Sequence, residues 1–179
     1  MKKLLIPCLF FIAISSAPSC SKPSESRTTT STAFFDVSGF FQSEIERLNQ
    51  LQPTVEKTFM VNQITETIPS KTLNYHLELS PFIECDINKK AWEDKYSIVE
   101  SDASLTYKTL DEQLEIREIT IQKDSSNHPT HIQIIKISES PLSYNKTMLK
   151  YHRNQEIEIV STQKNILSEE KEISTKIQF

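Results

Sequence analysis

Two neighbouring stretches, Gln113–Lys123 (QLEIREITIQK) and His131–Glu139 (HIQIIKISE), determine how this sequence is expected to fold. In both, branched apolar residues alternate with polar residues, which is typical of β-strands with one buried face. The alternation changes phase within each stretch. Leu114 and Ile116 face opposite to Ile119 and Ile121, and Ile132 and Ile134 face opposite to Ile135 and Ile137. We therefore expect either β-bulges or a sheet that is covered on both faces along part of its length.

The same period-two pattern extends from Tyr96 to the last residue, and thirteen isoleucines lie beyond residue 90. Asp, Asn, Ser and Pro separate the runs, as turn residues do. The predicted strands are Tyr96–Glu100, Ser104–Thr109, Gln113–Lys123, His131–Glu139, Thr147–Arg153, Glu156–Gln163 and Glu172–Phe179. The charged run 169–172 is interpreted as a solvated loop.

Upstream of these strands, the pattern predicts a helix that begins near Ser38 as N-cap and ends before Pro53. Its apolar stripe contains Phe41, Ile45, Leu48 and, less regularly, Leu51. The residues expected on the other side are Glu44, Glu46, Arg47 and Gln50.

A hairpin is predicted from Val55–Val61 and 64–68, with Asn62 and Gln63 as its turn, because Asn tolerates a positive φ. Leu73–Cys85 is periodic like a helix, and Ser80-Pro81 within it indicates a kink or a restart. The residues expected on the buried side are Leu73, Leu77, Phe82 and Ile83.

These patterns together predict an α+β fold. We expect a curved antiparallel β-sheet, formed by a meander of about seven strands plus an N-terminal hairpin. Two helices are expected to pack on one face of this sheet. The predicted domain spans residues 34–179.

A single glycine, Gly39, occurs in the 179 residues. Dinucleotide turns, phosphate-binding loops and nucleophile elbows all need glycine at fixed places, so the sequence excludes them. The formal net charge is -4 at pH 7 and the basic residues form no cluster, which argues against nucleic-acid binding.

Residues 1–19 have the pattern of a cleaved export signal. Lys2 and Lys3 precede the apolar run Leu4–Ile14, which is shorter than the about 20 residues that span a bilayer. Residues 20–33 begin with Cys20 and continue with thirteen residues that include eight Ser or Thr. This composition predicts a flexible tether between Cys20 and the domain.

Ala17, Ser19 and Cys20 resemble the lipobox of bacterial lipoproteins. The resemblance implies cleavage after Ser19 and lipidation of Cys20, which would anchor the chain in a membrane; the alternative is an ordinary leader with a chance cysteine. Ser21, where Asp would favour the inner membrane, favours the outer membrane, facing the periplasm. Cys85 is then the one free thiol of the mature chain, and we expect it in the core.

The segment 82–96, FIECDINKKAWEDKY, contains the densest set of distinctive residues. It resembles small uncharacterised lipoproteins of Bacteroidota, a family that brings no known activity. Asp86, Asn88, Trp92 and Tyr96 are our candidate partner-binding patch. The alternative is that the two aromatic residues close one end of the core.

Three further patterns suggest chemistry, and each has a simpler interpretation. His128 and His131 form an H-x-x-H pair without the further ligands of a metal site, so we expect exposed turn histidines. Glu84 and Asp86 could act as a carboxylate pair, but Asp86 or Asn88 is expected to cap the turn before Trp92. The sequence thus predicts no catalytic residue, metal or cofactor.

Function is predicted only by class. We expect a non-enzymatic binding or scaffolding module, anchored to the membrane through Cys20 and able to join an envelope protein complex. The alternative is a carrier of a lipid or other apolar ligand, with a cavity between the stripe of Phe41 and Ile45 and the sheet. A filled core at that place would argue against the carrier.

Overall fold

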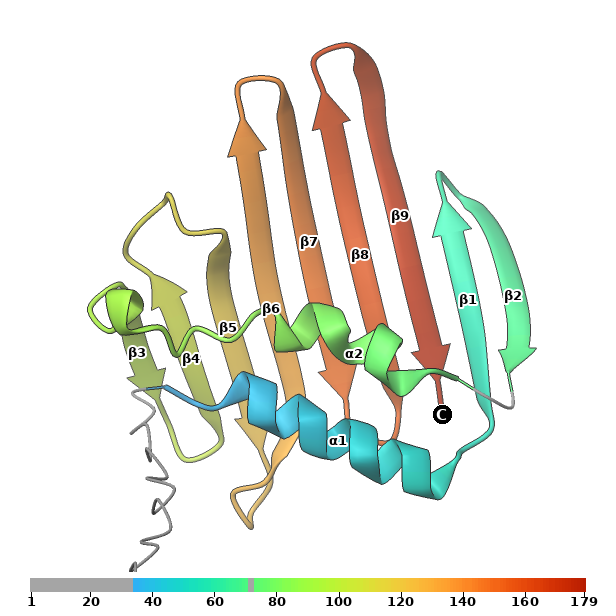
Figure 1. Ribbon diagram of the computed structural model, residues 1–179, viewed down its shortest axis with the longest axis horizontal. Coiled ribbons are helices and arrows are strands. Elements are labelled where there is room, and N and C mark those ends of the chain that lie inside the picture. Colours follow the sequence, from blue (N-terminus) through green and yellow to red (C-terminus); the bar gives the residue numbers. More distant parts are fainter. Residues whose placement is uncertain (1–33, 71–72) are drawn as a thin grey trace, which may run out of the picture. The chain divides into compact units, whose positions relative to one another are not determined.

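One antiparallel sheet of nine strands organises residues 34–70 and 73–179, which are the residues that the computed structural model describes (Figure 1). The strand order is β2-β1-β9-β8-β7-β6-β5-β4-β3, and the sheet is open. Its strands are β1 Val55–Val61, β2 Ile64–Ser70, β3 Tyr96–Glu100, β4 Ser104–Thr109, β5 Ile116–Lys123, β6 Pro129–Ser140, β7 Ser143–His152, β8 Glu156–Asn165 and β9 Ser168–Gln178.

The predicted α+β fold with two helices on one face is confirmed, and the predicted hairpin and meander merge into a single sheet. The merger occurs because β1 pairs with the last strand, β9, from Glu56 opposite Gln178 to Val61 opposite Ile173. The charged run 169–172 lies inside β9 and not in a loop, so that prediction was wrong. Its side chains are exposed, since no second layer covers this end of the strand.

The strands turn without glycine, as the turn composition predicts. Asn62 and Gln63, between β1 and β2, both have positive φ (46° and 71°), which is the geometry of a tight hairpin turn. Asn127 and Asn154 take up the left-handed conformation in two other connections (φ 65° and 60°). Asn adopts this conformation more readily than most side chains, so it replaces glycine here.

The first helix, α1 (Val37–Leu51), places Phe41, Ile45 and Leu48 in the core as predicted, whereas Leu51 is 61% exposed. Its N-cap is Asp36 and not Ser38: the Asp36 carboxylate accepts a hydrogen bond of 2.7 Å from the amide of Gly39. A side chain at Gly39 would meet this carboxylate, because an added Cβ would lie 2.2 Å from Oδ2 of Asp36. Glycine therefore leaves room for the cap.

The second helix, α2 (Tyr75–Ile83), runs through Pro81 without a restart. Pro81 has no amide hydrogen for the carbonyl of Leu77, and the Ser80 hydroxyl donates to that carbonyl instead (3.0 Å). The buried residues are Tyr75, Leu79 and Phe82, whereas Leu77, expected inside, is 66% exposed. The prediction took the wrong helical face at this end.

One of the two phase changes is a β-bulge. In β5, Ile116 pairs with Lys136 and Glu118 pairs with Ile135, so Arg117 is an extra residue. The bulge returns Ile116 to the buried face that Ile119 shares. The strand β6 is regular across its own phase change, and Ile135 and Ile137 lie half-buried on the opposite face.

Aromatic rings fill the layer between the helices and the sheet. Phe41 of α1 lies 4.6 Å from Phe82 of α2 and 5.3 Å from Tyr151 of β7, measured between ring centroids, and all three side chains are buried. The stripe of Phe41 and Ile45 thus packs directly on the sheet. Side chains occupy the place where the carrier alternative predicts a cavity.

The predicted export signal, the predicted lipidation site at Cys20 and the predicted tether lie outside the described residues. The described residues belong to one compact unit of the chain. Neither helix within 34–70 and 73–179 has the length and apolar character needed to cross a bilayer.

Candidate functional site

The predicted patch of Asp86, Asn88, Trp92 and Tyr96 lies in the segment that joins α2 to β3. Asn88 binds the chain just before α1: its Oδ1 accepts from the amide of Phe34 (3.0 Å), and its Nδ2 donates to the carbonyl of Phe35 (3.1 Å). Asp86 accepts from Nδ2 of Asn88 (2.9 Å). These two side chains therefore fix the chain at the entry to α1. The prediction that one of them caps the turn before Trp92 was wrong, because neither side chain caps it.

The aromatic members of the patch differ in exposure. Tyr96 is buried, donates to the carbonyl of Ile116 (3.0 Å) and packs edge-on against Phe34, and burial raises its pKa to about 12. Trp92 is half-buried, and Nζ of Lys89 lies 3.8 Å from the centroid of its ring. The four residues thus come together at the end of the core, where Tyr96 is buried and the side chains of Asp86, Asn88 and Trp92 are partly exposed.

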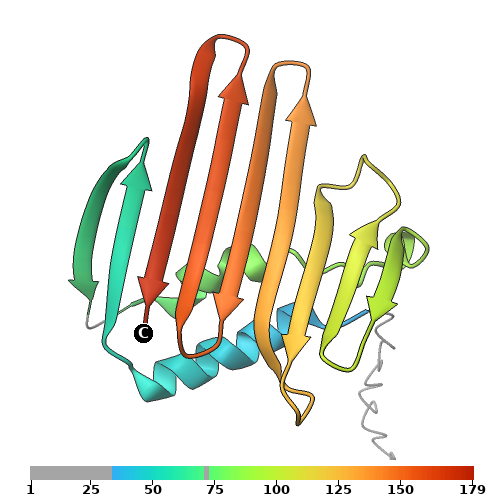
Figure 2. The same ribbon diagram turned by 180° about the vertical axis from the view of Figure 1, so that it is seen from behind.

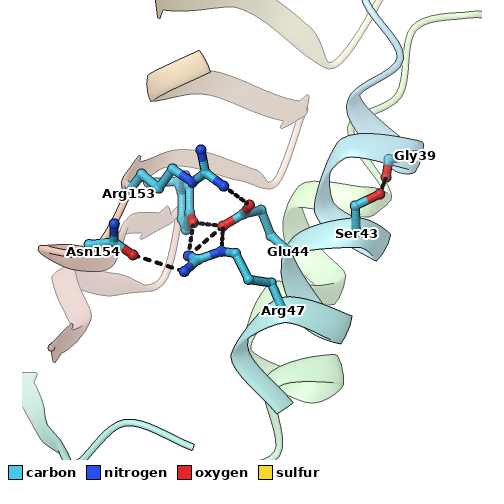
Figure 3. Close-up of polar contacts among 7 residues, drawn as sticks. Gly39, Ser43, Glu44, Arg47, Arg153 and Asn154 are labelled. Atoms are coloured by element: carbon cyan, nitrogen blue, oxygen red, sulfur yellow. Dashed lines mark hydrogen bonds and ion pairs between the residues drawn. The ribbon is translucent and has the colours of Figure 1, made fainter. Parts of the chain in front are cut away.

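The main charged cluster surrounds Glu44, which the sequence placed on the exposed side of α1. Glu44 is 4% exposed and accepts a hydrogen bond from the hydroxyl of Tyr151. Arg47 donates to it from Nε (2.9 Å) and Nη2 (2.7 Å), and Nη2 of Arg153 lies 3.2 Å from its other oxygen. Figure 3 shows the two arginines converging on Glu44, one from α1 and one from the end of β7.

This cluster is a structural connection between helix and sheet. Both carboxylate oxygens of Glu44 are engaged, and Arg47 continues to the side-chain oxygen of Asn154 (2.9 Å). Burial and the bond to Glu44 raise the pKa of Tyr151 far above its ordinary value, so the phenol keeps its proton. A signal for the burial of Glu44 exists in the sequence, because positions 41, 44, 45 and 48 share one face of a helix.

The histidines form a cross-strand pair and not the predicted turn pair. His131 on β6 is opposite His152 on β7, with ring centroids 5.2 Å apart, while His128 lies exposed before the strand. Burial, and then the neighbouring His152 and Lys150, lower the pKa of His131. Among residues 34–70 and 73–179, no three potential ligands group in a way that could hold a metal ion.

Cys85 is buried, as the sequence predicts, and its thiol donates to the carbonyl of Pro81. Burial raises its pKa to about 11. A thiol in this environment stays protonated and is a poor nucleophile at neutral pH.

A large part of the sheet stays uncovered because the helix layer is smaller than the sheet layer. Strands β6 to β9 contain 10 to 12 residues each and continue past α2, so their outer halves carry no helix (Figures 1 and 2). The helices pack on one face of the sheet, and the uncovered part of that same face on the outer halves is called the open helix-side face. Its residues alternate with those of the other face and are Lys136, Ser138, Asn145, Thr147, Ser161, Gln163, Lys171 and Ile173.

A cleft of about 310 Å³ lies where this face meets the end of α2. Pro81 and Glu84 form the helix side of the cleft. Its floor comes from β6, β7 and β8, and the residues are Lys136, Ser138, Asn145, Thr147, Leu149, Ile159 and Ser161. The cleft therefore combines a short apolar base with a floor of hydroxyl and amide groups.

The floor groups are connected to one another. The hydroxyl of Ser161 donates to Oδ1 of Asn145 (2.9 Å), and Thr147 lies within 3.4 Å of the Ser161 oxygen. At the edge, Nζ of Lys136 is 3.3 Å from Glu115, and hydrogen bonds from Ser138 and Lys136 lower the pKa of that carboxyl. This surface therefore presents hydrogen-bonding groups and, at its edge, one charge of each sign.

The sequence carries a signal for this cleft that the search for motifs missed. On β7 the inward positions change from apolar, at Leu149 and Tyr151, to polar, at Asn145 and Thr147. On β8 they change from Ile157 to Ser161. A change from apolar to polar residues on one strand face marks the place where covering layers end.

Comparison of the chain with protein-family models, with curated proteins and with solved structures finds no match.

Proposed function

We propose that this chain is a lipoprotein of the bacterial cell envelope, held at the outer membrane through Cys20 and facing the periplasm. Its folded part is a non-enzymatic module that binds another envelope protein through the open helix-side face. The sequence around Cys20, with Ala17 and Ser19 before it, supports the anchor. The cleft between α2 and the sheet supports the binding role.

The observation that carries the proposal is the half-covered sheet. The helices bury the lower halves of the strands, and the upper halves of β6 to β9 stay bare on both faces (Figures 1 and 2). A segment of another protein can lie along an exposed sheet face and contact its side chains, while a neighbouring helix contacts the segment from one side. Recognition is therefore the activity that this geometry supports best.

The chemistry of the cleft favours binding over catalysis. Its floor offers the hydroxyls of Ser138, Thr147 and Ser161 and the amide of Asn145, with Leu149 and Ile159 at its base. Hydroxyl nucleophiles need a general base within hydrogen-bond reach, and Ser161 donates its proton to an amide oxygen instead. Ser138 donates to the Glu115 carboxylate, but the lowered pKa of that carboxyl makes it a weak base. Hydrogen-bonding and apolar groups side by side are typical of a protein interface.

A photo-crosslinking amino acid at Ser161, in cells with native expression, tests the proposed face. Thr162 is the matched control, because adjacent residues of a strand face opposite sides. We expect a cross-linked protein from position 161 and none from position 162. Equal products from both positions, or none from 161, would overturn the proposal.

The anchor has a separate test. Growth with labelled palmitate should label the native chain, and Cys20→Ser should remove the label and release the protein from the membrane fraction. Label that persists in Cys20→Ser would contradict a lipid on this residue. Cys85→Ser is the control, since a buried thiol is no acceptor.

A further inference from the structure

Two neighbouring hairpin turns at the far end of the sheet expose aliphatic side chains. The turn between β6 and β7 contains Pro141 and Leu142, and the turn between β8 and β9 contains Ile166 and Leu167. Leu142 is 70% exposed, Ile166 67% and Leu167 97%. The amide of Ile166 donates to the carbonyl of Leu142 (3.1 Å), so these four residues form one unit, the paired tips.

The paired tips satisfy much of their own backbone. The hydroxyl oxygen of Ser140 accepts from the amides of Leu142 (3.3 Å) and Ser143 (3.1 Å). Its partner hydroxyl on Ser143 lies 2.9 Å away. An unpaired amide is costly in an apolar medium, so internally bonded turns are suited to leave water.

Polar residues follow directly behind the tips. Tyr144 of β7 pairs with Lys164 of β8, which places a phenol and a flexible ammonium side by side. Each lies two residues along its strand from a tip residue, Leu142 or Ile166. Tyrosine and lysine in this position suit the boundary between lipid tails and headgroups. Glu139 and Glu169 lie nearby, so the region lacks the positive charge that would select anionic lipids.

We propose that the paired tips insert into the surface of a zwitterionic phospholipid bilayer. Three aliphatic side chains cover far less than the roughly 800 Å² per partner of a stable protein interface. The tips project at the ends of two hairpins (Figure 1) and therefore cannot enclose a partner. A bilayer accepts a small apolar projection, and each aliphatic side chain that it buries strengthens binding about tenfold.

This insertion is independent of the proposed partner, because the residues around the tips and those that line the cleft are entirely different, although both sets lie on the same strands. A lipid contact at the tips would hold the end of the sheet that lies away from α1. The protein would then have two membrane contacts, one covalent through Cys20 and one reversible at the tips.

Tryptophan fluorescence in the full chain tests the insertion. Leu167→Trp provides a reporter at the tips (97% exposed), and Leu110→Trp provides a control at another exposed position of the fold (69%). The native Trp92 contributes the same background to both variants. Both are mixed with vesicles of phosphatidylethanolamine and phosphatidylcholine that carry brominated acyl chains.

We expect the emission of the tip reporter to shift to the blue and to be quenched about twofold more than the control, as for a residue about 5–10 Å deep. Adding Leu142→Asn and Ile166→Asn should abolish the difference. Adding Leu51→Asn and Leu77→Asn, at comparably exposed positions, should preserve it. Equal quenching of the two reporters would show that the tips remain in water and would overturn the proposal.

Discussion

At the scale of single residues, Glu44 explains how α1 is fixed to the sheet. Its carboxylate accepts from Tyr151 of β7 and from Arg47 of its own helix, and Arg153 just after β7 approaches its other oxygen. A buried carboxylate is costly unless such partners neutralise it. The cluster therefore specifies where along β7 the helix sits.

Replacing the charge should weaken the fold measurably. We expect Glu44→Gln to lower the free energy of unfolding by about 2 kcal/mol, since two partly exposed guanidinium groups lose their counter-charge. Glu46→Gln, at an exposed position of the same helix, should change it by less than about 0.5 kcal/mol. Denaturant titration measures both. Similar values for the two variants would contradict the role given to Glu44.

His131 should make the stability depend on pH. Its pKa in the folded protein lies below the 6.5 of a free imidazole, so the unfolded chain takes up a proton first as the pH falls. Stability is therefore lost as the pH falls through about 6.5. We expect the difference in unfolding free energy between pH 7.5 and pH 5.5 to shrink in His131→Gln. His76→Gln, at an exposed position of α2, is the control variant, and an unchanged difference in His131→Gln would refute this origin.

At the scale of elements, the phase change in the sequence indicates an irregularity in β5, but it does not identify Arg117 as the bulged residue. The change of phase between Ile116 and Ile119 predicts either an extra residue in the strand or a sheet covered on both faces, and the structure shows the extra residue. The similar change in β6 has another cause, because Ile135 and Ile137 lie on the uncovered face of a regular strand. Alternation alone does not separate these two cases, since both place apolar residues on opposite faces.

Deletion of single residues distinguishes the bulge from the regular strand. Without Arg117, the alternation of Ile116, Glu118 and Ile119 becomes regular, so we expect a cost of only about 1 kcal/mol. Deletion of Thr120 instead turns at least one core isoleucine outward and should cost about 3 kcal/mol. Thermal or denaturant unfolding compares the two. Equal destabilisation would argue that Arg117 is not the extra residue.

The helices were predicted in number and place, but not in every face or cap. Alternation and the stripe of Phe41, Ile45 and Leu48 depend on local periodicity, which the sequence displays directly. The cap at Asp36 depends on the space left by Gly39, and the exposure of Leu77 depends on where α2 lies on the sheet. Those are tertiary facts, so local patterns miss them.

At the scale of the whole folded unit, the central feature is the mismatch between long strands and short helices. Strands of 10 to 12 residues extend roughly 33–40 Å at about 3.3 Å per residue, and the two helices that cross them cover only part of this length. The layer of Phe41, Phe82 and Tyr151 is packed, and the surface beyond α2 is open. The sequence indicated this boundary only in the change from Leu149 to Thr147 and Asn145 along β7.

The binding role of the open helix-side face is tested most directly by blocking the cleft. Ser161→Trp places an indole on its floor, and Thr162→Trp places the same group on the opposite face of β8. We expect Ser161→Trp to reduce the recovery of the envelope partner from native membranes about tenfold, which corresponds to about 1.4 kcal/mol, and Thr162→Trp to leave it unchanged. Undiminished recovery with Ser161→Trp, in a variant whose Tm equals that of the native protein, would contradict the binding role of this face.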